Sequence, residues 1–74
     1  MSPLTKAVYD IIVSNDLKPM SASDIANVLG AGVTERQVYD AIRYEMSKGN
    51  FIFEKYTFRK PHTYAVNPEY LKYA

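Results

Sequence analysis

The sequence predicts a small α+β domain in which three helices are followed by a two-stranded β-hairpin. Over the first two thirds of the chain, apolar residues recur every three to four positions, the spacing of a helix that buries one face. From residue 51 onward the pattern alternates and aromatic residues become frequent, as in strands. With 74 residues, 47% of them hydrophobic and 23% charged, the chain can form one hydrophobic core and has no room for a second.

The first helix is expected from Pro3 to about Ser14 or Asn15. Ser2 is a good N-cap residue, and proline is well tolerated in the first turn. The helix should bury one stripe of apolar side chains, which consists of Leu4, Ala7, Val8, Ile11 and Ile12.

A short second helix is expected to begin after Pro19, which ends any continuation of the first. Ser21 can cap it, and Asp24 lies three residues later, where an acidic side chain also suits the positive end of the helix dipole. Gly30 is a plausible stop, since glycine adopts the left-handed conformation that ends many helices.

The third helix repeats the capping pattern, with Thr34 as N-cap and Gln37 three residues later. Gly49 and Asn50 should end it. One broad face of this helix is apolar and is formed by Val38, Ala41, Ile42 and Met46, whereas the opposite face carries Arg36, Asp40, Arg43 and Ser47.

The hairpin should consist of a strand over residues 51–58, a loop at 59–62 and a returning strand over 63–66. Tyr64 and Val66 are expected to face the core. The domain should therefore span residues 1–67, and residues 68–74 should form a short tail. In the first strand, two faces alternate: Phe51, Phe53, Lys55 and Thr57 on one, and Ile52, Glu54, Tyr56 and Phe58 on the other.

Composition argues against several classes of function. The chain has no cysteine and a single histidine, His62, so it offers no thiolate or histidine-rich metal site. It also lacks a glycine-rich phosphate loop, and we expect neither an enzyme nor a protein that takes a cofactor or a small-molecule ligand. No apolar run approaches the roughly 18 residues that would span a bilayer, so we expect a cytoplasmic protein, nucleoid-associated if the source is a bacterium or a phage.

Charge is unevenly distributed, although the formal net charge is only +1. Residues 1–33 carry two basic and three acidic side chains, whereas residues 34–74 carry seven and five. Between Lys55 and His62 there are three positive charges and no acid. The hairpin therefore has a basic loop, which suits contact with a polyanion.

The order of these elements resembles the winged helix-turn-helix family of DNA-binding domains, over roughly residues 3–67. Two segments carry the resemblance: "SASDIANVLGAGVTERQVYDAIRYEMSKGNFIF" and "HTYAV". Val38, Ile42, Gly49 and Phe51 lie where such domains keep apolar residues or glycine. The resemblance implies a winged-helix fold and a small sequence-specific regulator of transcription or replication. Its third helix would lie in the DNA major groove, and its hairpin, the wing, would contact the backbone or the adjoining minor groove.

Several side chains suit this binding mode. Arg36 and Arg43 could read guanine edges or hold phosphates, and Gln37 could pair with adenine. Thr34 and the amides at the start of the same helix could bind a phosphate. Together the candidate DNA-binding residues are Thr34, Arg36, Gln37, Arg43, Tyr44, Lys48, Lys55, Arg59, Lys60 and His62.

Glu45 departs from the family pattern, which usually has a leucine at this place on the apolar face of the third helix. An unpaired buried carboxylate would be costly. We therefore expect one of two solutions. Either Met46 takes its place through a small rotation of the helix, or Glu45 finds a basic or tyrosine partner at the edge of the core.

Two further alternatives remain open at this stage. Winged helices also serve as protein-interaction adaptors, and three acidic residues of the third helix, Glu35, Asp40 and Glu45, would suit a protein surface better than DNA. The apolar residues of the tail could fold back on the first helix or form a homodimer interface, and they are Tyr70, Leu71 and Tyr73.

Overall fold

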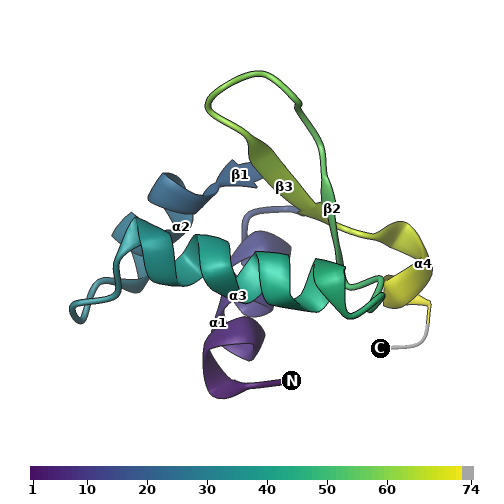
Figure 1. Ribbon diagram of the computed structural model, residues 1–74, viewed down its shortest axis with the longest axis horizontal. Helices are drawn as coiled ribbons and strands as arrows, with labels where there is room; N and C mark the ends of the chain where they lie inside the picture. Colours follow the sequence, from purple (N-terminus) through teal and green to yellow (C-terminus); the bar gives the residue numbers. More distant parts are fainter. Residues whose placement is uncertain (73–74) are drawn as a thin grey trace.

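The computed structural model describes residues 1–72, which form an α+β domain with four helices and a three-stranded antiparallel sheet (Figure 1). The coarse prediction of helices followed by a hairpin is confirmed. The elements are α1 (Pro3–Ser14), β1 (Met20–Ser21), α2 (Ala22–Leu29), α3 (Glu35–Ser47), β2 (Phe53–Lys55), β3 (Thr63–Val66) and α4 (Pro68–Leu71). None of the helices in this part of the chain combines the length and the apolar character needed to cross a membrane.

Each of the three long helices begins at the cap that its sequence predicts. The side chains of Ser2, Ser21 and Thr34 each accept a hydrogen bond of 3.1 Å from the amide three residues later. At α3 the Gln37 side chain also accepts a hydrogen bond of 2.8 Å from the Thr34 amide, which completes a capping box. These bonds fix where α2 and α3 begin, because they satisfy amides that have no partner inside a helix.

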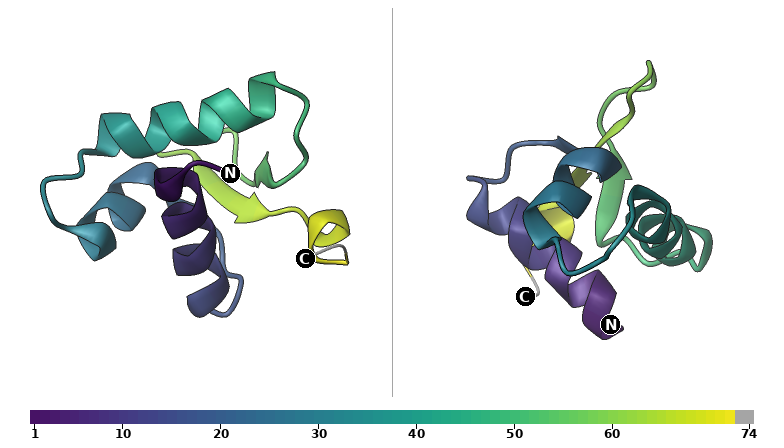
Figure 2. Two further views of the ribbon diagram at one scale, coloured as in Figure 1. Left: turned by 90° about the horizontal axis from the view of Figure 1, so that it is seen from below. Right: turned by 90° about the vertical axis from the view of Figure 1, so that its left-hand side faces the viewer.

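The core lies where the three long helices meet the sheet (Figure 2). Its centre is built from aliphatic side chains of all three helices, each with an exposed fraction of 0%: Val8, Ile12, Ile25, Val38 and Ile42. Phe53, Tyr64 and Val66 cover it from the sheet, with exposed fractions of 5% or less. Burial of this apolar surface is the main force that holds the helices against the sheet.

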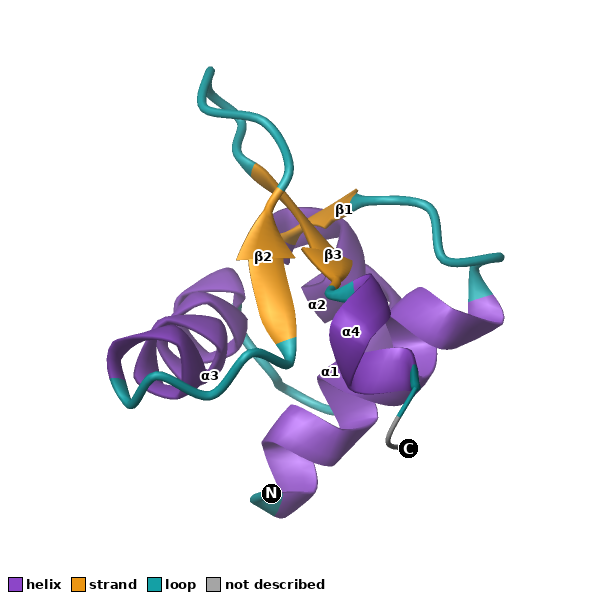
Figure 3. Ribbon diagram, turned by 90° about the vertical axis from the view of Figure 1, so that its right-hand side faces the viewer, coloured by secondary structure: helices purple, strands orange, loops and turns teal. Residues whose placement is uncertain are grey.

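The sheet has the strand order β1-β3-β2, so the returning strand of the hairpin is the central one (Figure 3). Met20 of β1 pairs with Tyr64, and Lys55 of β2 pairs with the same residue from the other side. The sequence analysis missed β1 because its two residues carry no periodic signal of their own. The predicted inward orientation of Tyr64 and Val66 is confirmed by their burial.

The predicted first strand, residues 51–58, is wrong in its length. Only Phe53–Lys55 forms a strand. The chain bends at Ile52, so that Ile52 and Phe53 are both buried although they are adjacent, while Phe51 is 46% exposed. Beyond the strand, one more backbone hydrogen bond joins the Tyr56 amide to the Thr63 carbonyl, at 2.8 Å. The alternation of apolar residues therefore extends over more of the sequence than the hydrogen-bonded ladder does.

Glu45 is buried, with an exposed fraction of 5%, and its partner differs from the predicted one. The chain turns after α3 and brings Asn50 back, so that the Asn50 side-chain amide donates a hydrogen bond of 2.6 Å to the Glu45 carboxylate. The Asn50 backbone amide donates a second bond, of 3.1 Å, to the Glu45 carbonyl. The carboxylate is thus paired with an amide rather than with a basic residue or a tyrosine. Met46 remains 37% exposed and does not replace it.

The tail folds back on the domain. Tyr70 of α4 packs edge-on against Tyr9 and Phe51, with ring centroids 5.6 Å and 5.9 Å away. Leu71 is partly buried against the core. The predicted contact of the tail with α1 is confirmed for Tyr70. Tyr73, the third apolar residue of the predicted tail interface, lies outside the described residues, and the homodimer stays a prediction.

The pairing of Glu45 with Asn50 predicts the stability of two variants. Asn50→Ala leaves the buried carboxylate without its donor and should lower the free energy of unfolding by about 1–3 kcal/mol. In a Glu45→Leu background the same substitution should have almost no effect, since there is no carboxylate left to satisfy. Urea denaturation of the four proteins measures both values. An equal loss in the two backgrounds would show that the side-chain pair contributes nothing.

Candidate functional site

The exposed face of α3 carries two arginines in different surroundings. The Arg36 guanidinium forms an ion pair with Asp40, at 3.1 Å, on side chains that are 81% and 58% exposed. Such a pair is weak and opens readily. Arg43 has no carboxylate partner among the described residues and instead donates a hydrogen bond of 3.2 Å to the Tyr39 hydroxyl. This bond and the partial charge of Tyr39 raise the pKa of the Arg43 guanidinium, which is cationic in any case.

Tyr39 lies between these two arginines on the same helix. The guanidinium carbons of Arg36 and Arg43 lie 6.0 Å and 5.7 Å from the centre of its ring, within range of cation–π attraction. The ring therefore holds both cations close to the surface of α3. The sequence analysis did not include Tyr39 among the site residues, although its spacing of three and four residues from the arginines is the spacing of helical neighbours.

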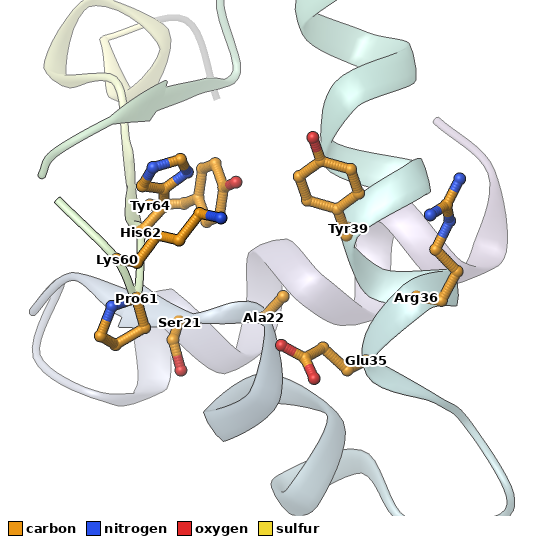
Figure 4. Close-up of a pocket in the computed structure, with 9 residues that line it drawn as sticks. All are labelled: Ser21, Ala22, Glu35, Arg36, Tyr39, Lys60, Pro61, His62 and Tyr64. Atoms are coloured by element: carbon orange, nitrogen blue, oxygen red, sulfur yellow. The ribbon is translucent and has the colours of Figure 1, made fainter. Parts of the chain in front are cut away.

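A cleft of about 630 Å³ separates the start of α3 from the loop of the β2–β3 hairpin (Figure 4). Its floor is formed by the start of α2, which β1 places beside β3. From the predicted set, its lining includes Arg36 on the α3 side and Lys60 and His62 together on the hairpin side (Figure 4). The complete lining is Ser21, Ala22, Glu35, Arg36, Tyr39, Lys60, Pro61, His62 and Tyr64.

Tyr64 is the most deeply buried residue of this cleft, with an exposed fraction of 2%. Its ring belongs to the core, whereas its hydroxyl points into the cleft toward α3 (Figure 4). The hydroxyl makes no hydrogen bond to another group of residues 1–72 and is open to solvent, since none of the buried polar side-chain atoms in this range lacks a partner. Burial raises the pKa of the Tyr64 hydroxyl, with a contribution from Tyr39 and a smaller opposing one from Arg43. At neutral pH the hydroxyl is therefore protonated and able to donate a hydrogen bond into the cleft.

The hairpin loop is closed by the side chain of Thr57. Its oxygen accepts a hydrogen bond of 3.0 Å from the Thr63 amide and lies 3.4 Å from the Pro61 carbonyl, to which it can donate. Beyond this closure, residues 58–62 project from the body of the molecule (Figures 2 and 3). We call these five residues the hairpin tip.

The cations of the hairpin are not neutralised. Arg59 and Lys60 are exposed on the hairpin tip, and Lys55 lies at its base with its ammonium nitrogen 5.8 Å from the centre of the Phe58 ring. None of the ion pairs found in the described part of the chain includes any of these three side chains. Their charges therefore face solvent without compensation, and His62 lies half-buried beside them.

The remaining predicted residues lie apart from the cleft. Thr34 and Gln37 are exposed at the start of α3 but bind each other in the capping box, so their oxygens are already in use. Tyr44 and Lys48 lie toward the far end of the helix, where the Lys48 ammonium is 5.4 Å from the centre of the Tyr44 ring. The structure thus groups part of the predicted set around one cleft and leaves the rest along α3 or, for Lys55 and Arg59, on the hairpin outside the cleft.

The polar side chains that line the cleft define the chemistry that it offers. No group of three or more histidine, cysteine, aspartate or glutamate side chains within residues 1–72 is arranged to hold a metal ion. The polar groups that converge are hydrogen-bond donors and cations, opposed by one carboxylate, that of Glu35. Comparisons of the chain with known protein families, with curated proteins and with solved structures found no match.

Proposed function

We propose that the protein is a winged-helix regulator that binds specific sites on double-stranded DNA and acts in transcription or replication. In this proposal α3 lies in the major groove, and the β2–β3 hairpin is a wing on the backbone or the adjoining minor groove. The observation that carries the proposal is the cleft between α3 and the hairpin tip, with Arg36 on one wall and Lys60 on the other. One strand of a duplex that lies along this cleft would meet Lys60 on the hairpin side and would reach Arg36 at the outer edge of the α3 side (Figure 4).

The exposed face of α3 supports the proposed contact with bases. Arg36 and Arg43 are seven residues apart, about two helical turns or 10 Å along the axis, so both lie on the same face of α3. An α-helix fits into the major groove, which is about 12 Å wide. The Tyr39 hydroxyl holds the Arg43 guanidinium through a hydrogen bond of 3.2 Å. A guanidinium that is already oriented loses less freedom when it binds the two acceptors of a guanine.

The Tyr64 hydroxyl supports the proposed contact with the backbone. It is a neutral donor on a buried ring, and it lies beside Lys60 and faces Tyr39 in the lining of the cleft (Figure 4). A phosphate oxygen accepts hydrogen bonds from hydroxyls and cations alike. In the cleft it would supply the partner that this hydroxyl lacks among the described residues.

The alternative function, a protein-interaction adaptor without DNA binding, rests on the acidic residues of α3. Two of the three are already engaged inside the molecule, since Asp40 pairs with Arg36 and Glu45 is buried against Asn50. Glu35 is exposed, and Asp40 is also exposed in its weak pair with Arg36, so two acidic side chains remain accessible to a basic partner. Only the burial of Glu45 argues against this alternative, and we keep DNA as the proposed partner because of the unpaired cations of the hairpin.

Removal of two cations from the hairpin tip tests the wing. In Arg59→Ala/Lys60→Ala, affinity for every duplex should fall, and the slope of log K against log salt should decrease in magnitude by about two, since each lost phosphate contact contributes about 0.9. Fluorescence anisotropy of labelled duplexes over a range of salt concentrations measures the slope. Lys72→Ala is the matched control, because this lysine is paired with Glu69 outside the cleft and the hairpin tip. If wild-type protein gives no anisotropy change even at low salt, the proposed function is wrong.

Substitution of Arg43 tests whether α3 contacts the bases in a sequence-specific way. Once selection from a random pool of duplexes has given the preferred site, Arg43→Ala should weaken binding to that site by about 1–3 kcal/mol and binding to unrelated duplexes much less. Tyr39→Phe removes only the hydroxyl that orients the guanidinium and should give a smaller loss of the same kind. If Arg43→Ala lost the same binding free energy on preferred and unrelated duplexes, Arg43 would contact a phosphate and not a base.

Tyr64→Phe tests the backbone contact without changing any charge. The variant should lose about 0.5–1.5 kcal/mol of binding free energy on all duplexes, the usual contribution of one hydrogen bond. Its salt slope should equal that of the wild type, because a neutral donor displaces no counterions, whereas Lys60→Ala should reduce the slope by about 0.9. The hydroxyl has no partner among residues 1–72, so the fold should be retained, which urea denaturation checks. Wild-type affinity in Tyr64→Phe would remove this residue from the site.

A further inference from the structure

Phe58 is the most exposed large apolar side chain of the described residues, with an exposed fraction of 79%. A single apolar residue on a surface is common and needs no explanation by itself. Phe58 differs in its position, because it is the first residue beyond the hydrogen bonds of Thr57 that close the loop. Phe58 therefore belongs to the hairpin tip, beyond the point where Thr57 closes the loop.

The surroundings of this ring are cationic. The Lys55 ammonium lies 5.8 Å from its centre, and Arg59 and Lys60 follow it directly in the sequence. These three side chains are absent from the ion pairs that residues 1–72 form. A second aromatic side chain, Tyr56, is 62% exposed at the base of the tip. The partner that fits an exposed ring among unpaired cations is an anionic surface with an apolar interior.

Duplex DNA is such a partner, since its phosphates enclose a stack of apolar bases. An aromatic or aliphatic wedge can enter this stack from the minor groove, partly unstack one base step and bend the duplex. The cations beside the ring would then contact the phosphates on either side of the step. The hairpin tip continues from the cleft wall that holds Lys60, so one duplex engaged in the cleft also passes the tip.

We propose that Phe58 is a wedge that inserts between two base pairs from the minor groove and bends the bound DNA. This inference rests on the proposed function and adds a specificity that the α3 contacts do not provide. Pyrimidine–purine steps such as TA unstack most easily, so the tip should favour sites with such a step where the hairpin meets the duplex. The energy spent on unstacking offsets much of the gain from stacking on the ring, so the bend should depend on Phe58 more strongly than the affinity does.

The experiment uses a duplex of about 30 base pairs that carries a central TA step, with a fluorescence donor and acceptor at its ends and 2-aminopurine at the step. Wild-type protein should increase energy transfer between the ends, because the bend shortens their separation, and should raise 2-aminopurine fluorescence, because the base unstacks. Phe58→Ala should lose both signals while its affinity, measured by anisotropy on the same duplex, falls by less than about tenfold. Phe58→Leu should retain both signals in part, since leucine also acts as a wedge.

Val28→Ala is the matched control, because Val28 is 64% exposed on α2 and is absent from the lining of the cleft. It should behave as the wild type in all three measurements. Wild-type binding without a bend or a 2-aminopurine signal would overturn the wedge and leave the proposed function intact, whereas no binding at all would overturn the proposed function. An unchanged bend in Phe58→Ala would also overturn the wedge. The wedge would be overturned as well if Phe58→Ala bound phosphatidylserine vesicles more weakly than the wild type does but bound and bent DNA as the wild type does. The tip would then be a membrane contact.

Discussion

The pairing of β3 with strands on both of its edges is the constraint on which the rest of the structure depends. Tyr64 pairs with Met20 on one side and with Lys55 on the other. The last residue of β1, Ser21, is also the cap of α2, so this pairing fixes the start of α2 against the hairpin. The core then holds α3 against α2 and the sheet. The width of the cleft follows from these contacts rather than from any interaction inside the cleft itself.

Composition understates how positive the candidate interface is. The chain carries nine basic and eight acidic side chains, yet two acids of α3 are used inside the molecule. The pair of Asp40 with Arg36 removes one charge of each sign, so it is the burial of Glu45 that leaves the exposed face of α3 less acidic than its composition suggests. The cations of the hairpin have no such partners among residues 1–72. A net charge near zero is therefore compatible with a local potential strong enough to attract a polyanion, because the potential depends on how the charges are distributed.

The features that were predictable from sequence are those that depend on neighbours three or four residues away. The caps at Ser2, Ser21 and Thr34 are of this kind, and so are the apolar stripes of the helices. β1 could not be predicted, because two residues become a strand only when β3 lies beside them. The partner of Glu45 depends on the turn after α3. The cations of the site were predictable from the sequence, and so was the position of Tyr39 beside the arginines of its own helix, whereas Tyr64 joins the site only when β3 folds beside α2 and α3.

The small size of the domain limits how DNA specificity could arise. The chain exposes 4899 Å², and a single DNA-binding module buries about 600–1,000 Å² of its surface, which here would be up to about a fifth of the whole. Few base contacts fit within such an area, and α3 offers only Arg36 and Arg43 as strong readers. Deformation of the duplex adds discrimination at base steps that no side chain reads by hydrogen bonds. In the proposed complex, a hairpin with an exposed ring at its tip would supply that second source of specificity with almost no additional surface, because one inserted side chain suffices to sense how easily a step unstacks.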